Sequence, residues 1–337
     1  MSTVVVTGVS GFLGSHLASE LLRTGHRVRG SLRDLGRAGR IRSAIAASGV
    51  DVSELDFVQL DLLSDAGWDE AMAGAQYLLH AASPFVTTMP KNPDELVGPA
   101  VAGTERAVGA AVAAGVERIV LTSSTVAIVH GRGKGGTPHL GANDWIDGHG
   151  GPMTAYAESK VRAERRAWEL VGDDPTRLAV VNPGFITGPI LDDDPGTSGA
   201  TLLRFLKGRI PMVPNLSLLS VDVRDVARVQ VAAMTDPRAA GQRIPTAFGD
   251  IDLYGIGQSL ATTHPEYARK MPRLHAPDWL IRLYARFDGD IAANVSELSY
   301  RPTLDSSLAG ELLGRGPISI GQSISDMADS LIERRLV

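Results

Sequence analysis

The sequence places a tyrosine and a lysine four residues apart, in the stretch Tyr156-Ala157-Glu158-Ser159-Lys160. Residues 156–171 are predicted to form a helix, and side chains four apart on a helix share one face, with Cβ atoms about 5–6 Å apart. A free phenol has a pKa of about 10 and is a weak acid–base catalyst near neutral pH. A neighbouring ammonium favours the phenolate and lowers that pKa. The pair is therefore predicted to transfer a proton.

A hydroxyl that orients a substrate carbonyl would complete this pair. Ser123 and Ser124 follow a predicted strand at 118–122; Ser124 is the preferred candidate and Ser123 is the alternative. Together the three groups suit carbonyl reduction, in which hydride reaches the carbon, Ser124 binds the oxygen and Tyr156 donates the proton. The reverse reaction oxidises an alcohol. A tyrosine and lysine at this spacing also occur by chance on surface helices, but lysine is scarce in this sequence.

Hydride transfer needs a dinucleotide, and the start of the chain suits one. Residues 4–7 are predicted to form a buried, β-branched strand, and three glycines, Gly8, Gly11 and Gly14, follow at the spacing GxxGxxG. A helix predicted from 11 to 24 would direct its unpaired N–H groups at a pyrophosphate. The alternative is a glycine-rich turn that binds nothing.

The residue that follows the second predicted strand, at 27–32, indicates the cofactor. Arg33 stands where an NAD enzyme normally has an acidic residue, and arginine forks two N–H groups onto a 2′-phosphate. Arg40 lies seven residues further on. NADP(H) is therefore favoured and NAD(H) is possible, since Asp34 competes for the acidic position and the arginines would also suit a solvated helix face.

The chain alternates predicted strands with helical patterns, which indicates an α/β fold, a Rossmann-type doubly wound parallel sheet. Further strands are predicted at 57–60, 76–80, 178–182 and 243–248. A smaller, mostly helical C-terminal lobe would hold the substrate. The dinucleotide-binding domain is expected at 1–183 with a return segment at about 221–250, and the lobe at 184–220 and 251–337. The glycine-rich loop at 131–151 is predicted to be functional, and His80 to be a packed strand-end residue.

Composition excludes several classes of protein. The net charge of -5 gives no basic footprint for nucleic acid, and there is no cysteine for a disulfide, a thiolate metal site or a nucleophile. No metal is expected. No apolar run is long enough to span a bilayer, and the chain enters its first strand at once. We expect a cytoplasmic protein with a small-molecule partner, either a monomer or a homodimer built on the helices at 94–114 and 156–171.

These motifs together resemble the extended short-chain dehydrogenases/reductases, the NAD-dependent epimerase/dehydratase family, and within it the dihydroflavonol reductase-like group of aldehyde and ketone reductases. The segments that carry the resemblance are 7–14, 28–34, 80–85, 121–124, 182–184 and 221–227. The likeness implies that Ser124, Tyr156 and Lys160 are the catalytic triad. It implies cofactor contacts by Thr7, Gly8, Ser10, Gly11, Phe12, Leu13, Arg33, Arg40, Asp61, Leu62, Ala81, Ala82, Ser83, Thr122, Ser123, Tyr156, Lys160, Pro183, Phe185 and Ile186.

The substrate is less well indicated. The plant lignin-pathway signature is absent before Tyr156, which argues against a cinnamoyl-CoA substrate. The pocket candidates are largely apolar, which favours a hydrophobic aldehyde or ketone: Phe85, Thr125, Val126, Met153, Phe185, Leu202, Phe205 and Val213. Alternatives are a nucleotide-sugar epimerase or dehydratase or a hydroxysteroid dehydrogenase using NAD, a regulator that senses NADP without turnover, and a scaffold module.

Overall fold

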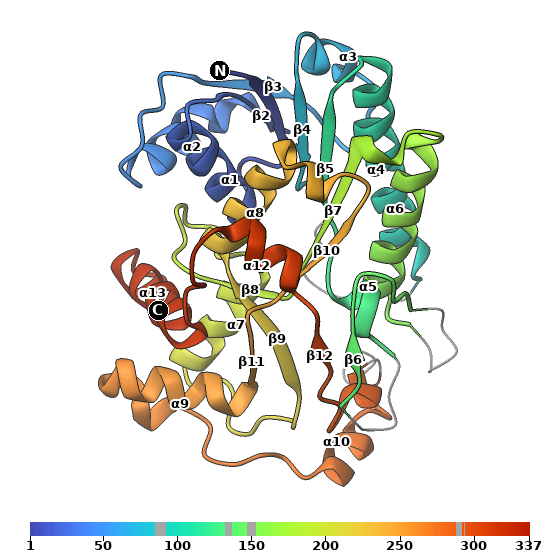
Figure 1. Cartoon of the computed structure of the whole chain (residues 1–337). Helices are drawn as coiled ribbons and strands as arrows, with labels where there is room; N and C mark the ends of the chain where they lie inside the picture. Colours follow the sequence, from blue (N-terminus) through green and yellow to red (C-terminus); the bar gives the residue numbers. More distant parts are fainter. Residues whose placement is uncertain (85–91, 132–136, 147–152, 288–291, 293) are drawn as a thin grey trace.

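The computed structural model describes residues 1–84, 92–131, 137–146, 153–287, 292 and 294–337 (Figure 1). The strands are β1 (Thr3–Thr7), β2 (Arg27–Leu32), β3 (Leu55–Gln59), β4 (Tyr77–His80), β5 (Arg118–Thr122), β6 (His139–Leu140), β7 (Leu178–Pro183), β8 (Phe185–Thr187), β9 (Ser217–Asp222), β10 (Arg243–Thr246), β11 (Gly249–Asp252) and β12 (Thr303–Leu304). The helices are α1 (Phe12–Arg23), α2 (Ala38–Ala46), α3 (Trp68–Met72), α4 (Asp94–Ala113), α5 (Val126–Val129), α6 (Ala155–Val171), α7 (Gly196–Leu206), α8 (Val223–Thr235), α9 (Leu253–Thr263), α10 (Asp278–Tyr284), α12 (Ser307–Leu313) and α13 (Ile320–Glu333).

The main sheet has seven strands in the order β10-β7-β5-β4-β1-β2-β3, and every neighbouring pair is parallel. This is the doubly wound sheet that the sequence predicts. The first strand is buried on both faces, because Val4, Val5 and Val6 have no exposed surface. The late strand predicted at 243–248 is β10, at the sheet edge.

Helices cover both faces of the sheet (Figure 1). On one face, α1, α2, α8 and α12 pack against side chains such as Val4 and Val28. On the other face, α3, α4 and α6 cover Val5 and Leu78. Among the described helices, none is both long and apolar enough to cross a membrane. The start of α6 lies at the end of the sheet where the parallel strands have their carboxyl ends. This end is called the carboxyl edge below.

The C-terminal lobe contains a small sheet that the sequence analysis did not predict. It has the order β11-β9-β8, in which β8 and β9 are parallel and β9 and β11 antiparallel. Helices α7, α9 and α13 pack together against this sheet around Phe205. The expected division of the chain fails at α12, because Ala309 and Leu313 belong to the core of the main domain instead of the lobe.

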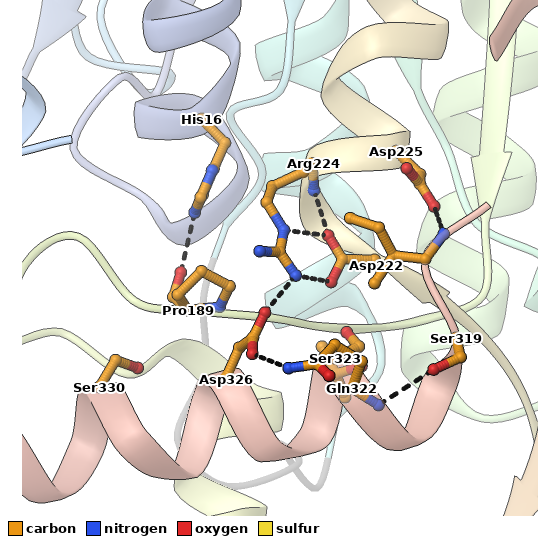
Figure 2. A network of polar contacts seen from close by, with 12 residues as sticks. His16, Pro189, Asp222, Arg224, Asp225, Ser319, Gln322, Ser323, Asp326 and Ser330 are labelled. Carbon is orange, nitrogen blue, oxygen red and sulfur yellow. Dashed lines mark hydrogen bonds and ion pairs between the residues drawn. The ribbon is translucent and has the colours of Figure 1, made fainter. Parts of the chain in front are cut away.

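Polar contacts tie the main domain to the lobe (Figure 2). Asp222 ends β9 with no exposed surface and caps α8 by accepting the Arg224 N–H. The Arg224 guanidinium bridges Asp222 at 2.8 Å and Asp326 on α13 at 2.6 Å. His16 on α1 bonds the carbonyl of Pro189 at 2.8 Å. The main domain and the lobe are therefore joined by an ion-pair bridge through Arg224 and by a separate hydrogen bond from His16.

Candidate active site

The glycine turn between β1 and α1 is shaped by close backbone contacts. Gly8 has a φ of +71°, a left-handed conformation that favours glycine, and its N–H donates to Ser31 Oγ at 3.0 Å. A Cβ at Gly14 would lie 2.1 Å from the Gly8 carbonyl oxygen. Gly11 caps α1 without a side-chain acceptor, so the first N–H groups of the helix face outward. This bare cradle fits a pyrophosphate.

A buried hydrogen-bond chain holds the end of β4 beside that turn. The Thr7 hydroxyl lies 2.7 Å from His80 Nδ1 and accepts the Ala82 N–H at 3.1 Å. Burial, with a smaller contribution from the charge of Lys160, lowers the pKa of His80 to about 3, so the imidazole is neutral. His80 is a packed residue, as the sequence predicts. Thr7 has no exposed surface, so its hydroxyl positions the two strands and does not face a cofactor.

The three predicted catalytic residues lie at the carboxyl edge of the sheet. Ser124 follows β5, and its Oγ accepts the Val126 N–H at 3.3 Å. Tyr156 and Lys160 lie on the first turns of α6, whose start is capped by the Thr154 hydroxyl. The Lys160 ammonium is 5.7 Å from the centre of the Tyr156 ring and 3.4 Å from Ser83 Oγ. Tyr156 is 37% exposed, so its phenol is open to a substrate.

The structure also distinguishes Ser124 from Ser123, the alternative candidate for the catalytic serine. Ser123 is buried, and its hydroxyl donates to Glu164 Oε2 at 2.5 Å, so that proton is already engaged. Thr122, predicted to contact the cofactor, instead bonds Gln230 on α8 through its hydroxyl. Ser124 is also buried, at 8% exposed, but its hydroxyl only accepts a hydrogen bond, from the Val126 N–H, so its proton is free to be donated within the described contacts.

The arginines predicted to bind a 2′-phosphate differ in their surroundings. Arg33 directly follows β2 and is exposed, and within the described ranges its side chain makes no ion pair. Arg40 is instead paired with Asp192 at 2.6 Å and Asp193 at 3.3 Å, carboxylates of the segment that precedes α7. Asp61 follows β3 and accepts the Leu63 N–H. Arg33 is thus the open cation beside the glycine turn.

The predicted substrate residues differ in their burial and in the clusters to which they belong. Leu202, Phe205 and Val213 have no exposed surface and belong to the core of the lobe, so we assign them a packing role. Met153 and Val126 pack at the edge of a small cluster around α5 and α6. Thr125, also predicted, is buried and donates its N–H to the Pro183 carbonyl. Phe85 lies outside the described residues.

The other residues predicted to contact the cofactor lie at the start of α1, after strands of the main sheet, and in β8 of the lobe. Ser10, Phe12 and Leu13 are half-buried at the start of α1. Leu62 and Ala81 follow β3 and β4. Pro183 ends β7, and Phe185 and Ile186 are half-buried in β8.

The sequence analysis missed one buried charged cluster behind the serine pair. Glu164, Asn182 and Arg243 are buried, and Glu164 bonds both of the others. Glu164 is four residues beyond Lys160 and eight beyond Tyr156, and this helical spacing places all three on one face of α6. That spacing is the one signal in the sequence that would have indicated Glu164.

The fold defines an α/β protein of the dinucleotide-binding type, with a glycine turn after β1 inside the sheet. The chain matches the NAD dependent epimerase/dehydratase family over residues 4–246 and belongs to that family, as predicted. Tetraketide alpha-pyrone reductase 2 of Arabidopsis thaliana is 31% identical over 253 residues, which cover 72% of this chain and 77% of that protein. Cinnamoyl-CoA reductase 1 of Petunia hybrida is 32% identical, with 78% of each chain covered.

Solved structures share the fold over nearly the whole chain. Yeast methylglyoxal/isovaleraldehyde reductase Gre2, complexed with NADPH, aligns with a TM-score of 0.78 at 23% identity, covering 99% of each chain. Vestitone reductase from alfalfa aligns with a TM-score of 0.75 at 21% identity, covering all of both chains. The match extends beyond the sheet and includes the C-terminal lobe.

Proposed function

We propose that the protein is an NADPH-dependent reductase of aldehydes or ketones that also oxidises the matching alcohols. The observation that carries the proposal is the pairing of Tyr156 with Lys160, whose ammonium lies 5.7 Å from the tyrosine ring, at the start of α6, together with Ser124 directly after β5 of the sheet that bears the glycine turn. The relatives named above are reductases, and the Gre2 structure holds NADPH, which supports the same chemistry here.

Each of the three side chains has a distinct task in this reaction. NADPH, when bound, supplies the hydride. The Ser124 hydroxyl donates a hydrogen bond to the substrate oxygen and fixes its position. Tyr156, which is partly exposed, gives its proton to that oxygen. The Lys160 ammonium lies near the Tyr156 ring and favours the phenolate left behind.

The preference for NADPH rests on Arg33. This exposed arginine follows β2, the strand whose end faces the adenosine ribose in this type of fold. A planar guanidinium binds a phosphate through two N–H groups, whereas it gains little from a ribose hydroxyl. The substrate is proposed to be a hydrophobic carbonyl compound, since Met153, Val126 and Phe185 remain as apolar neighbours of the catalytic edge.

The test is NADPH oxidation with a panel of aromatic and aliphatic aldehydes and ketones, with NADH alongside. We expect turnover with NADPH, slower turnover with NADH, and a loss of kcat of about 10²–10⁴-fold in Tyr156→Phe. Tyr77→Phe is the matched control, because that phenol bonds Glu117 at the opposite end of β4. Full activity in Tyr156→Phe would refute the site.

The same assay separates the alternatives. A preference for NADH would favour an epimerase, dehydratase or hydroxysteroid dehydrogenase. NADPH binding without turnover of any carbonyl would favour a sensor. That the protein is cytoplasmic, and either monomeric or homodimeric, stays a prediction.

A further inference from the structure

A buried carboxylate lies directly behind the proposed catalytic residues. Glu164 has no exposed surface, and it occupies α6 one turn after Lys160 and two turns after Tyr156. An ionised carboxylate is costly to bury unless it is paired and hydrogen-bonded. The proposed reaction gives Glu164 no direct part, so its presence at this position calls for another role.

Glu164 joins its own helix to three strands. Its Oε2 accepts hydrogen bonds from Ser123 Oγ on the β5 side, at 2.5 Å, and from Asn182 Nδ2 of β7, at 3.0 Å. Its Oε1 accepts the Nε–H of Arg243 in β10 at 2.5 Å. One side chain therefore fixes the separation between α6, which carries Tyr156 and Lys160, and the strand end that carries Ser124.

The Arg243 guanidinium extends the same cluster to the segment before α6. Its Nη1 donates to the carbonyl of Ala142 at 2.8 Å and to that of Asp144 at 2.5 Å. Its guanidinium carbon is 3.8 Å from the centre of the Trp145 ring. The charge of Glu164 is thus neutralised by a cation that is itself held in place by backbone carbonyls and an aromatic face.

The position of Ser124 depends on this cluster through its backbone. Asn182 Nδ2, held by Glu164, lies 3.4 Å from the Ser124 carbonyl oxygen, and the preceding residue, Ser123, bonds Glu164 directly. Ser123, Lys160 and Glu164 line one small pocket, so the carboxylate lies beside the space behind the catalytic lysine. The cluster contacts all the elements that carry the triad.

We propose that Glu164 is a positioning residue, which sets the Ser124 hydroxyl against Tyr156 and Lys160 by bonding Ser123 and Asn182. The inference rests on the proposed function. A shift of about 1 Å between reacting groups lowers a rate by about 100-fold. Loss of the carboxylate should therefore lower kcat while the glycine turn and Arg33, which are remote from the cluster, continue to bind NADPH.

The experiment compares Glu164→Gln and Ser123→Ala with wild type in kcat, in the Kd for NADPH and in Tm. Glutamine keeps the shape but cannot accept hydrogen bonds from Arg243 and from both other donors at once. We expect kcat to fall about tenfold or more in both variants, with the Kd for NADPH within about twofold of wild type. Ser123→Thr, which keeps the hydroxyl, should restore most of the kcat lost in Ser123→Ala.

Glu105→Gln is the matched control, because Glu105 also pairs with an arginine of α6, Arg166, at 2.7 Å, but on the outer face. It should leave kcat unchanged. If wild type turns over and Ser123→Ala and Glu164→Gln match its kcat while Tm falls, Glu164 is only structural and the inference is refuted. If wild type reduces no carbonyl compound, the proposed function fails first, and the positioning role fails with it.

Discussion

The glycine turn gives the sharpest prediction, because the structure assigns different tasks to Gly11 and Gly14. A Cβ at Gly14 would lie 2.1 Å from the Gly8 carbonyl oxygen, whereas such a carbon and oxygen need about 3.3 Å. The turn and α1 would have to separate by about 1 Å. Overpacking of this kind costs about 1–3 kcal/mol or more, and the gain in helix propensity offsets about 1 kcal/mol of it.

Gly14→Ala is therefore expected to lose about 2 kcal/mol of unfolding free energy, which for a chain of 337 residues corresponds to a fall in Tm of about 3 °C. Gly11 differs, because its φ of -80° and ψ of 166° suit any residue and its Cβ would lie 3.3 Å from the Gly8 oxygen. Gly11→Ala should keep its Tm within about 1 °C. The added methyl group would stand where a phosphate approaches the N–H groups, so the Kd for NADPH should rise at least about tenfold.

Thermal unfolding and NADPH fluorescence titration measure both quantities on the same samples. Gly109→Ala in α4 is the control, since a Cβ there meets nothing within 4 Å. It should neither lower Tm nor raise the Kd for NADPH. Wild-type NADPH affinity in Gly11→Ala would refute the placement of the phosphate. An unchanged Tm in Gly14→Ala would refute the packing argument.

Three further perturbations address the cofactor, the pH response and the junction between the main domain and the lobe. Arg33→Ser should raise the KM for NADPH about 10- to 100-fold and leave the KM for NADH unchanged. Steady-state kinetics measure both constants, and an equal rise in the two would exclude a contact between Arg33 and the 2′-phosphate. Burial lowers the pKa of His16 to about 4, so the folded state binds fewer protons than the unfolded state below pH 6.5. The neutral His16 therefore contributes about 3 kcal/mol to the free energy of unfolding above pH 6.5, and this contribution should be lost as the pH falls towards 4. Urea unfolding at a series of pH values measures the loss, which should be smaller in His16→Asn. Arg224→Met leaves the buried Asp222 carboxylate without its cation and should lower the free energy of unfolding by about 2–3 kcal/mol. The control Arg166→Met removes an exposed ion pair and should lower it by less than about 1 kcal/mol, with both values measured by chemical denaturation.

The sequence by itself determined the features that depend on near neighbours in the chain. The buried β1 strand, the glycine spacing and the tyrosine–lysine pair on one helical face follow from local periodicity and backbone geometry. The parallel order of the strands follows from their alternation with helices. The sequence does not predict the small sheet of the lobe, because β8 and β11 are short and β9 lacks a regular alternation of polar and apolar residues.

Only the tertiary structure decided which side chains meet across the chain. Glu164 and Arg243 are 79 positions apart, and Arg224 and Asp326 are 102 apart, so no local pattern indicates either pair. The same holds for the choice between the two serines, since Ser123 turns to Glu164 only because α6 packs behind β5. Leu202 and Phe205 looked like pocket residues because an apolar side chain suits a binding site and a core equally well, and only their packing shows that they are core.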